Sequence, residues 1–161
     1  DCRHFGKMGD GQLKEIKGDI FTTQADLICV TTNGIVVNGL LVMGAGIAKL
    51  FADRYPRIRK ILGYQVERHG NLPHLFETDD HKMVCSFPTK HNYSDPSDMR
   101  LIRQSAYRLV DIVNMSWEYP NPCRTVLLPR PGCGLGGLSW QKDVKPVLEG
   151  ILDDRFSVIT P

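Results

Sequence analysis

The sequence VMGAGIA, residues 42–48, lies between a strand-like stretch and a helix-like stretch, and the sequence GCGLGGL, residues 132–138, does the same. Glycine has no Cβ, so it tolerates φ > 0 and lets bare backbone N–H groups approach an anion closely. A helix that starts at such a loop also points the positive end of its dipole at the anion. Two such loops, far apart in the sequence, predict a diphosphate that is bound from both sides.

The composition indicates a single globular domain. The 161 residues fit one domain, and an apolar fraction of 42% supplies a normal core. Twenty Lys and Arg residues against 18 Asp and Glu residues give a formal net charge of +2, and these charges are scattered. This pattern does not predict a large non-specific nucleic-acid surface, although a modified nucleic acid could still be a substrate. We expect one domain over residues 1–161, with its core at residues 13–160.

The five cysteines are typical of reduced thiols rather than of a disulfide or zinc framework. Their number is odd, no pair has metal-ligand spacing, and Cys29, Cys85 and Cys123 fall in or beside apolar runs. No apolar run approaches the roughly 20 residues of a membrane span, and there is no signal peptide. We therefore expect a cytoplasmic protein that uses no metal or other cofactor. Because the chain begins with Asp1 rather than Met, it could be a processed or excised piece with flanking domains outside it.

Apolar patterning predicts alternating strands and helices. Strands are expected at residues 13–21, 27–30, 75–76, 83–87, 125–128 and 156–159. Helices are expected after the first glycine loop, at residues 58–66, from a cap at Asp95 with Pro96 in the first turn, and after the cap residue Ser139. The first helix is expected to bury Ile47, Leu50 and Phe51. This order predicts an α/β fold in which a mainly parallel or mixed sheet has helices on both faces.

Other nucleotide-binding and catalytic motifs fit less well. The segment Gly44-x-Gly46 partly matches the dinucleotide fingerprint, but it does not directly follow the apolar strand that ends at Val30, and the acidic residue expected roughly 20 residues later is missing. The chain has no P-loop lysine motif and no Gly-x-Ser-x-Gly elbow. A Cys133 nucleophile would need a paired base, and no histidine is clearly placed for that role.

Taken together, the motifs resemble a macro domain. The resemblance is carried by Gly18-Asp19-Ile20, Asn33, the first glycine loop, and Pro129–Trp140, and it covers nearly the whole chain. The patterns Met-Gly-x-Gly-Ile-Ala and Gly-Cys-Gly-Leu are most similar to the branch that holds the DNA ADP-ribosyl glycohydrolase antitoxins and the terminal ADP-ribose protein glycohydrolase. The resemblance implies a three-layer α/β/α fold, with a mixed, mostly parallel sheet and an ADP-ribose cleft.

The resemblance also implies a role for each motif. Asp19 is expected to accept a hydrogen bond from the adenine amino group, with Ile20 beside the ring, and Asn33 is expected to contact the distal ribose. The other expected ligand-binding residues are Met43, Gly44, Ala45, Gly46, Ile47, Ala48, Thr89, Gly132, Cys133, Gly134, Leu135, Gly136, Gly137 and Leu138. In the simpler alternative, Asp19 and Asn33 are turn residues without a role in binding, and Trp140 only covers the core.

Lys90 decides between an enzyme and a binding module. In the resembled glycohydrolases, a lysine at the matching place attacks the anomeric carbon of the distal ribose or assists opening of the sugar. We therefore expect Lys90 and Asn33 to be catalytic, whereas a solvated loop lysine is the simpler alternative. The protein glycohydrolase has an aspartate where this chain has Gly136, so the DNA antitoxin pattern, which relies on the asparagine and the lysine, fits better.

The sequence leaves three functions open. The first is hydrolysis of an ADP-ribosyl linkage on a nucleic acid or a protein. The second is a binding module that senses ADP-ribose or a related nucleotide signal without turnover, in which Lys90 would be dispensable. The third is removal of phosphate from ADP-ribose 1″-phosphate, a reaction known elsewhere in the superfamily. All three require ADP-ribose or an ADP-ribosylated molecule as the partner.

Overall fold

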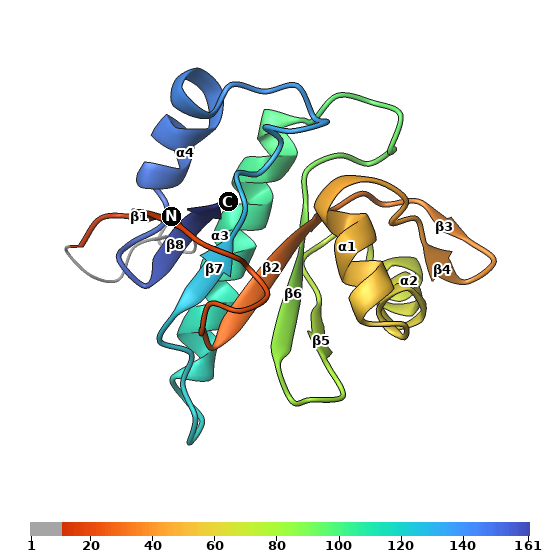
Figure 1. The fold of residues 1–161 in the computed structure, drawn as a ribbon, viewed down its shortest axis with the longest axis horizontal. Coiled ribbons are helices and arrows are strands. Elements are labelled where there is room, and N and C mark those ends of the chain that lie inside the picture. Colours follow the sequence, from red (N-terminus) through yellow and green to blue (C-terminus); the bar gives the residue numbers. More distant parts are fainter. Residues whose placement is uncertain (1–10) are drawn as a thin grey trace.

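The structure is a computed structural model that describes residues 11–161, and it is built on one six-stranded sheet (Figure 1). The sheet has the order β1-β8-β7-β2-β6-β5. Its strands are β1 (Lys14–Lys17), β2 (Leu27–Thr32), β5 (Leu75–Glu77), β6 (Met83–Pro88), β7 (Val126–Leu128) and β8 (Phe156–Thr160). All neighbours are parallel except β5, which runs antiparallel to β6. The mixed, mostly parallel sheet predicted from the sequence is confirmed.

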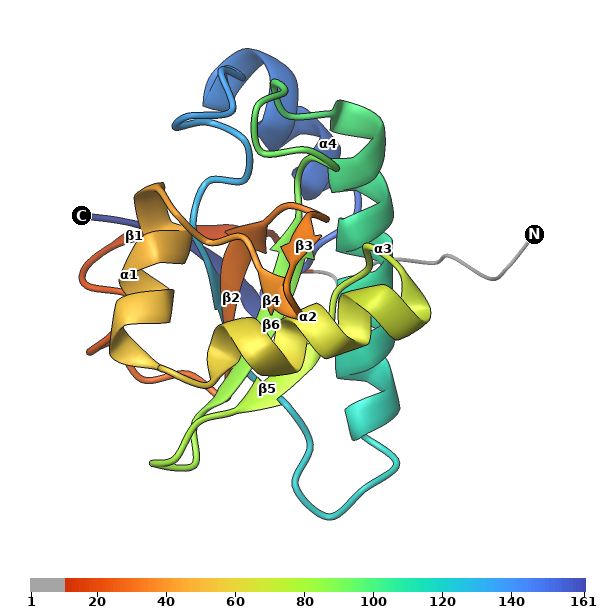
Figure 2. The same ribbon diagram turned by 90° about the vertical axis from the view of Figure 1, so that its right-hand side faces the viewer.

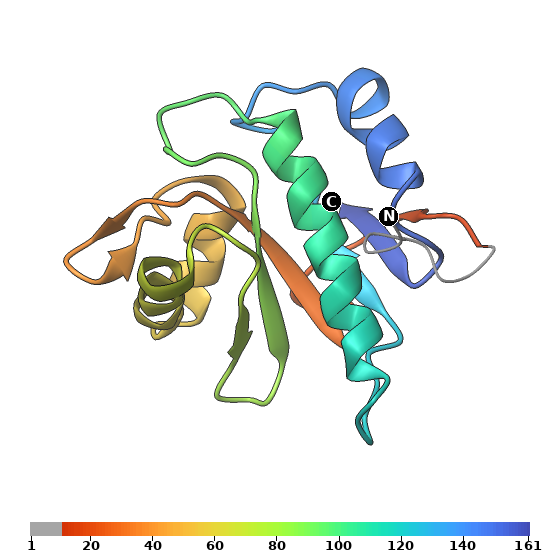
Figure 3. The same cartoon turned by 180° about the vertical axis from the view of Figure 1, so that it is seen from behind.

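Helices cover both faces of this sheet because side chains alternate along each strand. On β2, Leu27 and Cys29 belong to one buried cluster, whereas Ile28 and Val30 belong to the other. The helices are α1 (Gly46–Arg54), α2 (Ile58–His69), α3 (Met99–Ser116) and α4 (Lys145–Glu149). Figure 2 shows α1 and α3 on opposite sides of the sheet, and Figure 3 shows α3 in front of it. The predicted three-layer α/β/α arrangement is therefore confirmed.

Three details differ from the sequence-based prediction. The first strand ends at Lys17 rather than at Phe21, because Asp19 starts a turn in which its Oδ1 accepts a hydrogen bond from Phe21 N at 2.8 Å. Helix α3 is capped by Asp98 rather than by Asp95, since the Asp98 side chain accepts from Arg100 N. Leu50 is 53% exposed, whereas Phe51 is buried as predicted, Ile47 is partly buried, and Ala48 is buried as well.

The cap at Ser139 agrees with the prediction, but the helix that follows is not a simple one. The Ser139 side chain accepts from Lys142 N at 3.1 Å. The chain then makes a π-helical turn, η1 (Trp140–Val144), before it enters the short α4. Val144 and Leu148 are buried in the cluster that also contains Trp140, so this segment closes one face of the sheet.

A two-stranded hairpin precedes α1, and the strands predicted from the sequence did not include it. Strand β3 (Val36–Val37) pairs antiparallel with β4 (Leu40–Leu41). Asn38 and Gly39 have φ values of 52° and 78°, as a hairpin turn with two left-handed residues requires. The hairpin packs on α2 and leads the chain from the end of β2 to the first glycine loop.

Gly63 lies where α2 meets this hairpin, and we expect Gly63→Ala to destabilise the fold. A Cβ at this residue would lie 2.6 Å from Gly39 O and 2.9 Å from Leu41 N, which are both backbone atoms. Such overpacking costs about 1–3 kcal/mol, which outweighs the ~1 kcal/mol gain in helix propensity. Urea unfolding followed by circular dichroism measures the change in the free energy of unfolding.

Gly150→Ala is the matched control for this prediction. A Cβ there would have its nearest contact at 3.4 Å, and the residue has an ordinary φ of −78°. Equal free energies of unfolding for the two variants would show that the contact between α2 and the hairpin is not tight.

Candidate functional site

A cleft of about 1210 Å³ lies at the carboxyl ends of β2, β6 and β7. Thr32 on β2 is opposite Pro88 on β6, so the next residues, Asn33 and Thr89, begin the cleft side by side. The segments that follow β6 and β7 arch over the same end of the sheet at which α1 begins (Figure 1). Ligands of open α/β sheets bind at such strand ends, so this cleft is the candidate site.

Most of the predicted site residues line this cleft. They are Asn33, Met43, Gly44, Ala45, Gly46, Ile47, Ala48, Thr89, Lys90, Gly132, Gly134, Leu135, Gly136 and Gly137. Cys133 and Leu138 are not among the lining residues. Leu138 packs against the core, and the Cys133 thiol donates to Pro131 O. Burial raises the pKa of the Cys133 thiol, which does not favour a thiolate nucleophile at neutral pH.

Asp19 and Ile20 are also outside the set of lining residues. The Asp19 side chain is exposed, and one of its oxygens already caps the turn that the residue starts. Ile20 is buried in the same cluster as Met43 and Ala48. The adenine contacts that the sequence predicts for these two residues therefore stay a prediction.

The first glycine loop presents backbone N–H groups without acceptors. Helix α1 begins at Gly46, and its cap residue Ala45 makes no side-chain capping bond. Gly46 has a φ of 58°, a conformation that favours glycine. In the part of the chain that the structure describes, the first bond of the helix runs from Lys49 N to Ala45 O, and the N–H groups of residues 44–48 have no protein acceptor.

The second glycine loop, which lines the same cleft, also presents backbone N–H groups without acceptors. Gly132 and Gly137 have φ values of 76° and 80°, and Leu138 N donates to Gly132 O at 2.9 Å, which closes the loop. Among residues 11–161, no acceptor is found for the N–H groups of residues 134–136. Three successive N–H groups of this kind form a concave site for an anion.

The two loops approach each other at Leu135. A Cβ at Gly46 would lie 3.5 Å from Leu135 Cδ1, so this side chain reaches the start of α1. Leu135 is 76% exposed, which places it at the outer rim of the cleft rather than in the core. The unpaired N–H groups of both loops therefore line one cleft, with the apolar Leu135 side chain at its rim.

Asn33 and Lys90 reach the cleft from neighbouring strand ends. Asn33 Nδ2 donates to Val42 O at 2.8 Å, and its Oδ1 accepts from Ile35 N at 2.9 Å. The side chain thus anchors the hairpin and keeps one N–H for a ligand. The Lys90 side chain lines the cleft, and its amine makes no hydrogen bond or ion pair within the described residues.

Asn71 holds the backbone around Lys90, and the sequence analysis missed it. Asn71 Nδ2 donates to Lys90 O at 3.1 Å and lies 3.1 Å from His91 Nδ1. Gly34 N donates to His91 O at 2.9 Å, which ties the same segment to the end of β2. Asn71 lies between α2 and β5, and no sequence pattern connects it with Lys90.

The cleft wall also contains residues that were not among the predicted site residues. They are Thr31, Thr32, Val42, Tyr93, Ser94, Asp95, Pro96, Ser97, Pro129 and Arg130. Arg130 Nη2 lies 3.8 Å from Glu15 Oε1, and Arg130 Cζ lies 5.3 Å from the centroid of the Trp140 ring. Hydrogen bonds from Lys145 and Trp140 lower the pKa of Glu15, which keeps this carboxylate charged beside Arg130. Trp140 is 5% exposed, so it covers the core, which is the simpler alternative given for this residue in the sequence analysis.

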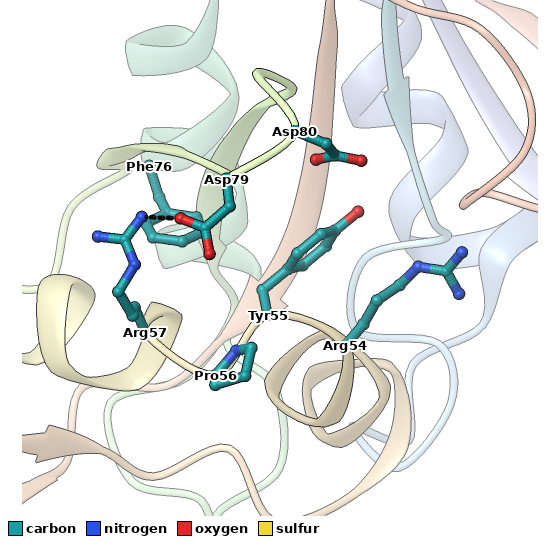
Figure 4. A pocket seen from close by; sticks show the side chains of 7 residues that line it. All are labelled: Arg54, Tyr55, Pro56, Arg57, Phe76, Asp79 and Asp80. Carbon is teal, nitrogen blue, oxygen red and sulfur yellow. Dashed lines mark hydrogen bonds and ion pairs between the residues drawn. The ribbon is translucent and has the colours of Figure 1, made fainter.

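A second cavity of about 230 Å³ lies elsewhere, between the end of α1 and the β5–β6 connection (Figure 4). It is lined by Arg54, Tyr55, Pro56, Arg57, Phe76, Asp79 and Asp80. Arg57 is already paired with Asp79 at 2.5 Å, and both side chains are largely exposed. Since Arg57 is already paired and the volume is small, this cavity is a weaker candidate for a ligand site than the large cleft.

The expectations about thiols, metals and membranes can be compared with the described residues. Cys29, Cys85, Cys123 and Cys133 are free thiols, and Cys2 lies outside the described residues. Over residues 11–161, no cluster of three or more His, Cys, Asp or Glu side chains is placed to hold a metal ion. Over the same range, no helix has the length and apolar character needed to cross a membrane.

Comparison with known proteins adds sequence relatives. No family model matches the chain. It is 31% identical over 146 residues to the DNA ADP-ribosyl glycohydrolase of Mycobacterium tuberculosis. This alignment covers 84% of this chain but only 40% of the mycobacterial protein. It is also 27% identical over 154 residues to the ADP-ribose glycohydrolase OARD1 of Bos taurus. That alignment covers 92% of this chain and 91% of the bovine protein.

Solved structures share the fold. The macrodomain of Mycobacterium tuberculosis DarG superposes with a TM-score of 0.71 at 24% identity, over 94% of this chain and 99% of that one. Thermosipho africanus DarTG in complex with ADP-ribose gives a TM-score of 0.74 at 21% identity, over 93% of this chain and 43% of that one. With the strand order, these similarities show that the chain has the macrodomain fold and is similar in sequence to DNA ADP-ribosyl glycohydrolases.

Proposed function

We propose that this macro domain binds ADP-ribose and hydrolyses the linkage between ADP-ribose and a nucleic acid or protein. The observation that carries the proposal is that two sets of N–H groups without acceptors, at residues 44–48 and 134–136, line the same cleft as Lys90. The names of the sequence relatives support the same reaction class. The chain spans only 40% of the mycobacterial relative, so the substrate of that whole protein is only proposed for this chain.

In the proposed complex, the two glycine loops hold the diphosphate. The start of α1 contributes its unpaired N–H groups and its dipole, and the second loop contributes the N–H groups of residues 134–136. The remaining N–H of Asn33 then faces the distal ribose at the end of β2. Asp19 accepts from the adenine amino group with the oxygen that its turn leaves free.

In the proposed reaction, Lys90 and Asn33 act at the anomeric carbon of the distal ribose. The fixed diphosphate holds the sugar against the ends of β2 and β6, where both side chains lie. The bond from the anomeric carbon to the substrate atom breaks, and water supplies a hydroxyl to the carbon and a proton to the leaving group. Lys90 attacks the carbon or assists ring opening, and Asn33 orients the sugar while positive charge develops on it.

The proposal includes a cytoplasmic location. The four cysteines that the structure describes are free thiols, and Cys29 and Cys85 are fully buried. Reduced thiols are the usual state of cysteine in a reducing compartment, which supports this part of the proposal.

Lys90→Ala is expected to reduce turnover by about 100-fold or more, because it removes the group that acts on the anomeric carbon. Its affinity for ADP-ribose should stay close to that of the unmodified protein, since the backbone N–H groups are unchanged. Release of ADP-ribose from ADP-ribosylated DNA and from ADP-ribosylated protein is measured by chromatography, and affinity is measured by calorimetry.

Lys60→Ala is the control for Lys90→Ala, since Lys60 is exposed on α2 and does not line the cleft. If Lys90→Ala leaves turnover untouched, Lys90 is not catalytic. If the unmodified protein binds ADP-ribose but turns over neither substrate nor ADP-ribose 1″-phosphate, it is a binding module instead. Turnover of the 1″-phosphate alone would identify a phosphatase.

Gly134→Val is expected to abolish binding while the fold remains intact. A Cβ at residue 134 meets no protein atom within 4 Å, so the new side chain fits the protein but projects into open space beside the loop. That space is where the proposal places phosphate. Calorimetry with ADP-ribose measures the affinity, and thermal unfolding checks the fold.

The smaller substitution Gly134→Ala provides a graded control, and it should weaken binding less than Gly134→Val does. Undiminished affinity in both variants would mean that the second loop does not bind the diphosphate.

A further inference from the structure

Ser97, which directly precedes the cap of α3, has a buried hydroxyl without a partner. The residue is 9% exposed, and in the part of the chain that the structure describes its Oγ makes no hydrogen bond. Buried polar groups nearly always have a partner, so an unpaired one needs an explanation. Ser97 is also a lining residue of the ADP-ribose cleft, which makes a ligand the natural acceptor.

Backbone hydrogen bonds fix Ser97 between the second glycine loop and the strand ends. Ser97 N donates to Gly136 O at 3.0 Å. The next residue, Asp98, donates from its N to Thr89 O at 2.8 Å, and Thr89 N donates to Thr32 O at 3.0 Å. These bonds tie the backbone of the Ser97 segment to the loop proposed for the diphosphate and to the strand ends that precede Asn33 and Lys90, and the buried hydroxyl itself lies against Gly136.

Ser97 also occupies the volume that a side chain at residue 136 would need. A Cβ on Gly136 would collide with Ser97 Oγ and would lie 2.6 Å from Gly132 O. A carboxylate on the loop at residue 136 therefore does not fit this backbone. At this point of the cleft, the polar group comes from the segment before α3, as a neutral hydroxyl, and not from the loop.

We propose that Ser97 Oγ donates a hydrogen bond to a hydroxyl of the distal ribose and so positions that sugar for Lys90. This inference rests on the proposed function. The diphosphate already has the N–H groups of both loops, whereas the ribose lies at the strand ends to which the Ser97 segment is tied. A neutral hydroxyl suits a neutral sugar, since it can donate to one ribose oxygen and accept from another.

The test compares Ser97→Ala with the unmodified protein, using ADP-ribose and ADP as ligands. ADP lacks the distal ribose. The affinity for ADP-ribose should fall by about five- to tenfold, the loss expected for one hydrogen bond, while the affinity for ADP stays unchanged. The ligand-free variant should melt at the same or a higher temperature, because it no longer buries an unpaired hydroxyl. A purely structural role would instead lower the melting temperature.

Ser94→Ala is the matched control, because Ser94 also lines the cleft but its Oγ already donates to Asn92 Oδ1 at 2.8 Å. Its ADP-ribose affinity should match that of the unmodified protein. Ser97→Gly removes the same hydroxyl as Ser97→Ala and should give the same loss of ADP-ribose affinity.

Two outcomes would overturn the role of Ser97 alone: an unchanged affinity of Ser97→Ala for ADP-ribose, or an equal loss for ADP and ADP-ribose. If the unmodified protein binds neither ligand, the proposed function itself fails. Calorimetry on the unmodified chain therefore separates the two failures.

Discussion

The site depends on one constraint, which is that two sets of backbone N–H groups must line the same cleft without acceptors of their own. The open start of α1 supplies one set, and residues 134–136 supply the other. Unpaired N–H groups are unfavourable unless water or a ligand accepts from them. Positive φ values at Gly46, Gly132 and Gly137 make this backbone possible, which explains why both loops are rich in glycine.

Hydrogen bonds of side chains hold the segments that carry Asn33 and Lys90, the two residues proposed to be catalytic. The Asn33 side chain bonds to Val42 and Ile35, so the hairpin and the first loop have a fixed relation to the end of β2. Asn71 bonds to the carbonyl of Lys90. The backbone around Lys90 is thus held by several partners while its amine stays free within the described chain, as a group that must meet a substrate requires.

The relation between Ser97 and Gly136 shows how one packing contact restricts the chemistry of the site. Because Ser97 Oγ lies where a Cβ at residue 136 would be, the second loop cannot carry a side chain at that point. This chain therefore cannot use a mechanism that needs a carboxylate at residue 136. The proposed mechanism with a lysine, an asparagine and a hydroxyl-bound sugar uses only groups that the cleft contains.

The sequence by itself determined the order of the helices and of the strands in the main sheet, the two glycine loops and the Ser139 cap. These features depend on apolar periodicity and on the φ preferences of residues that are neighbours in the chain. Only the tertiary structure decided that Asn71 supports Lys90, that Ser97 lies against Gly136, and that Leu135 reaches the start of α1. Each of these contacts joins residues far apart in the chain, and their geometry is set by how the helices pack on the sheet, which no local pattern encodes.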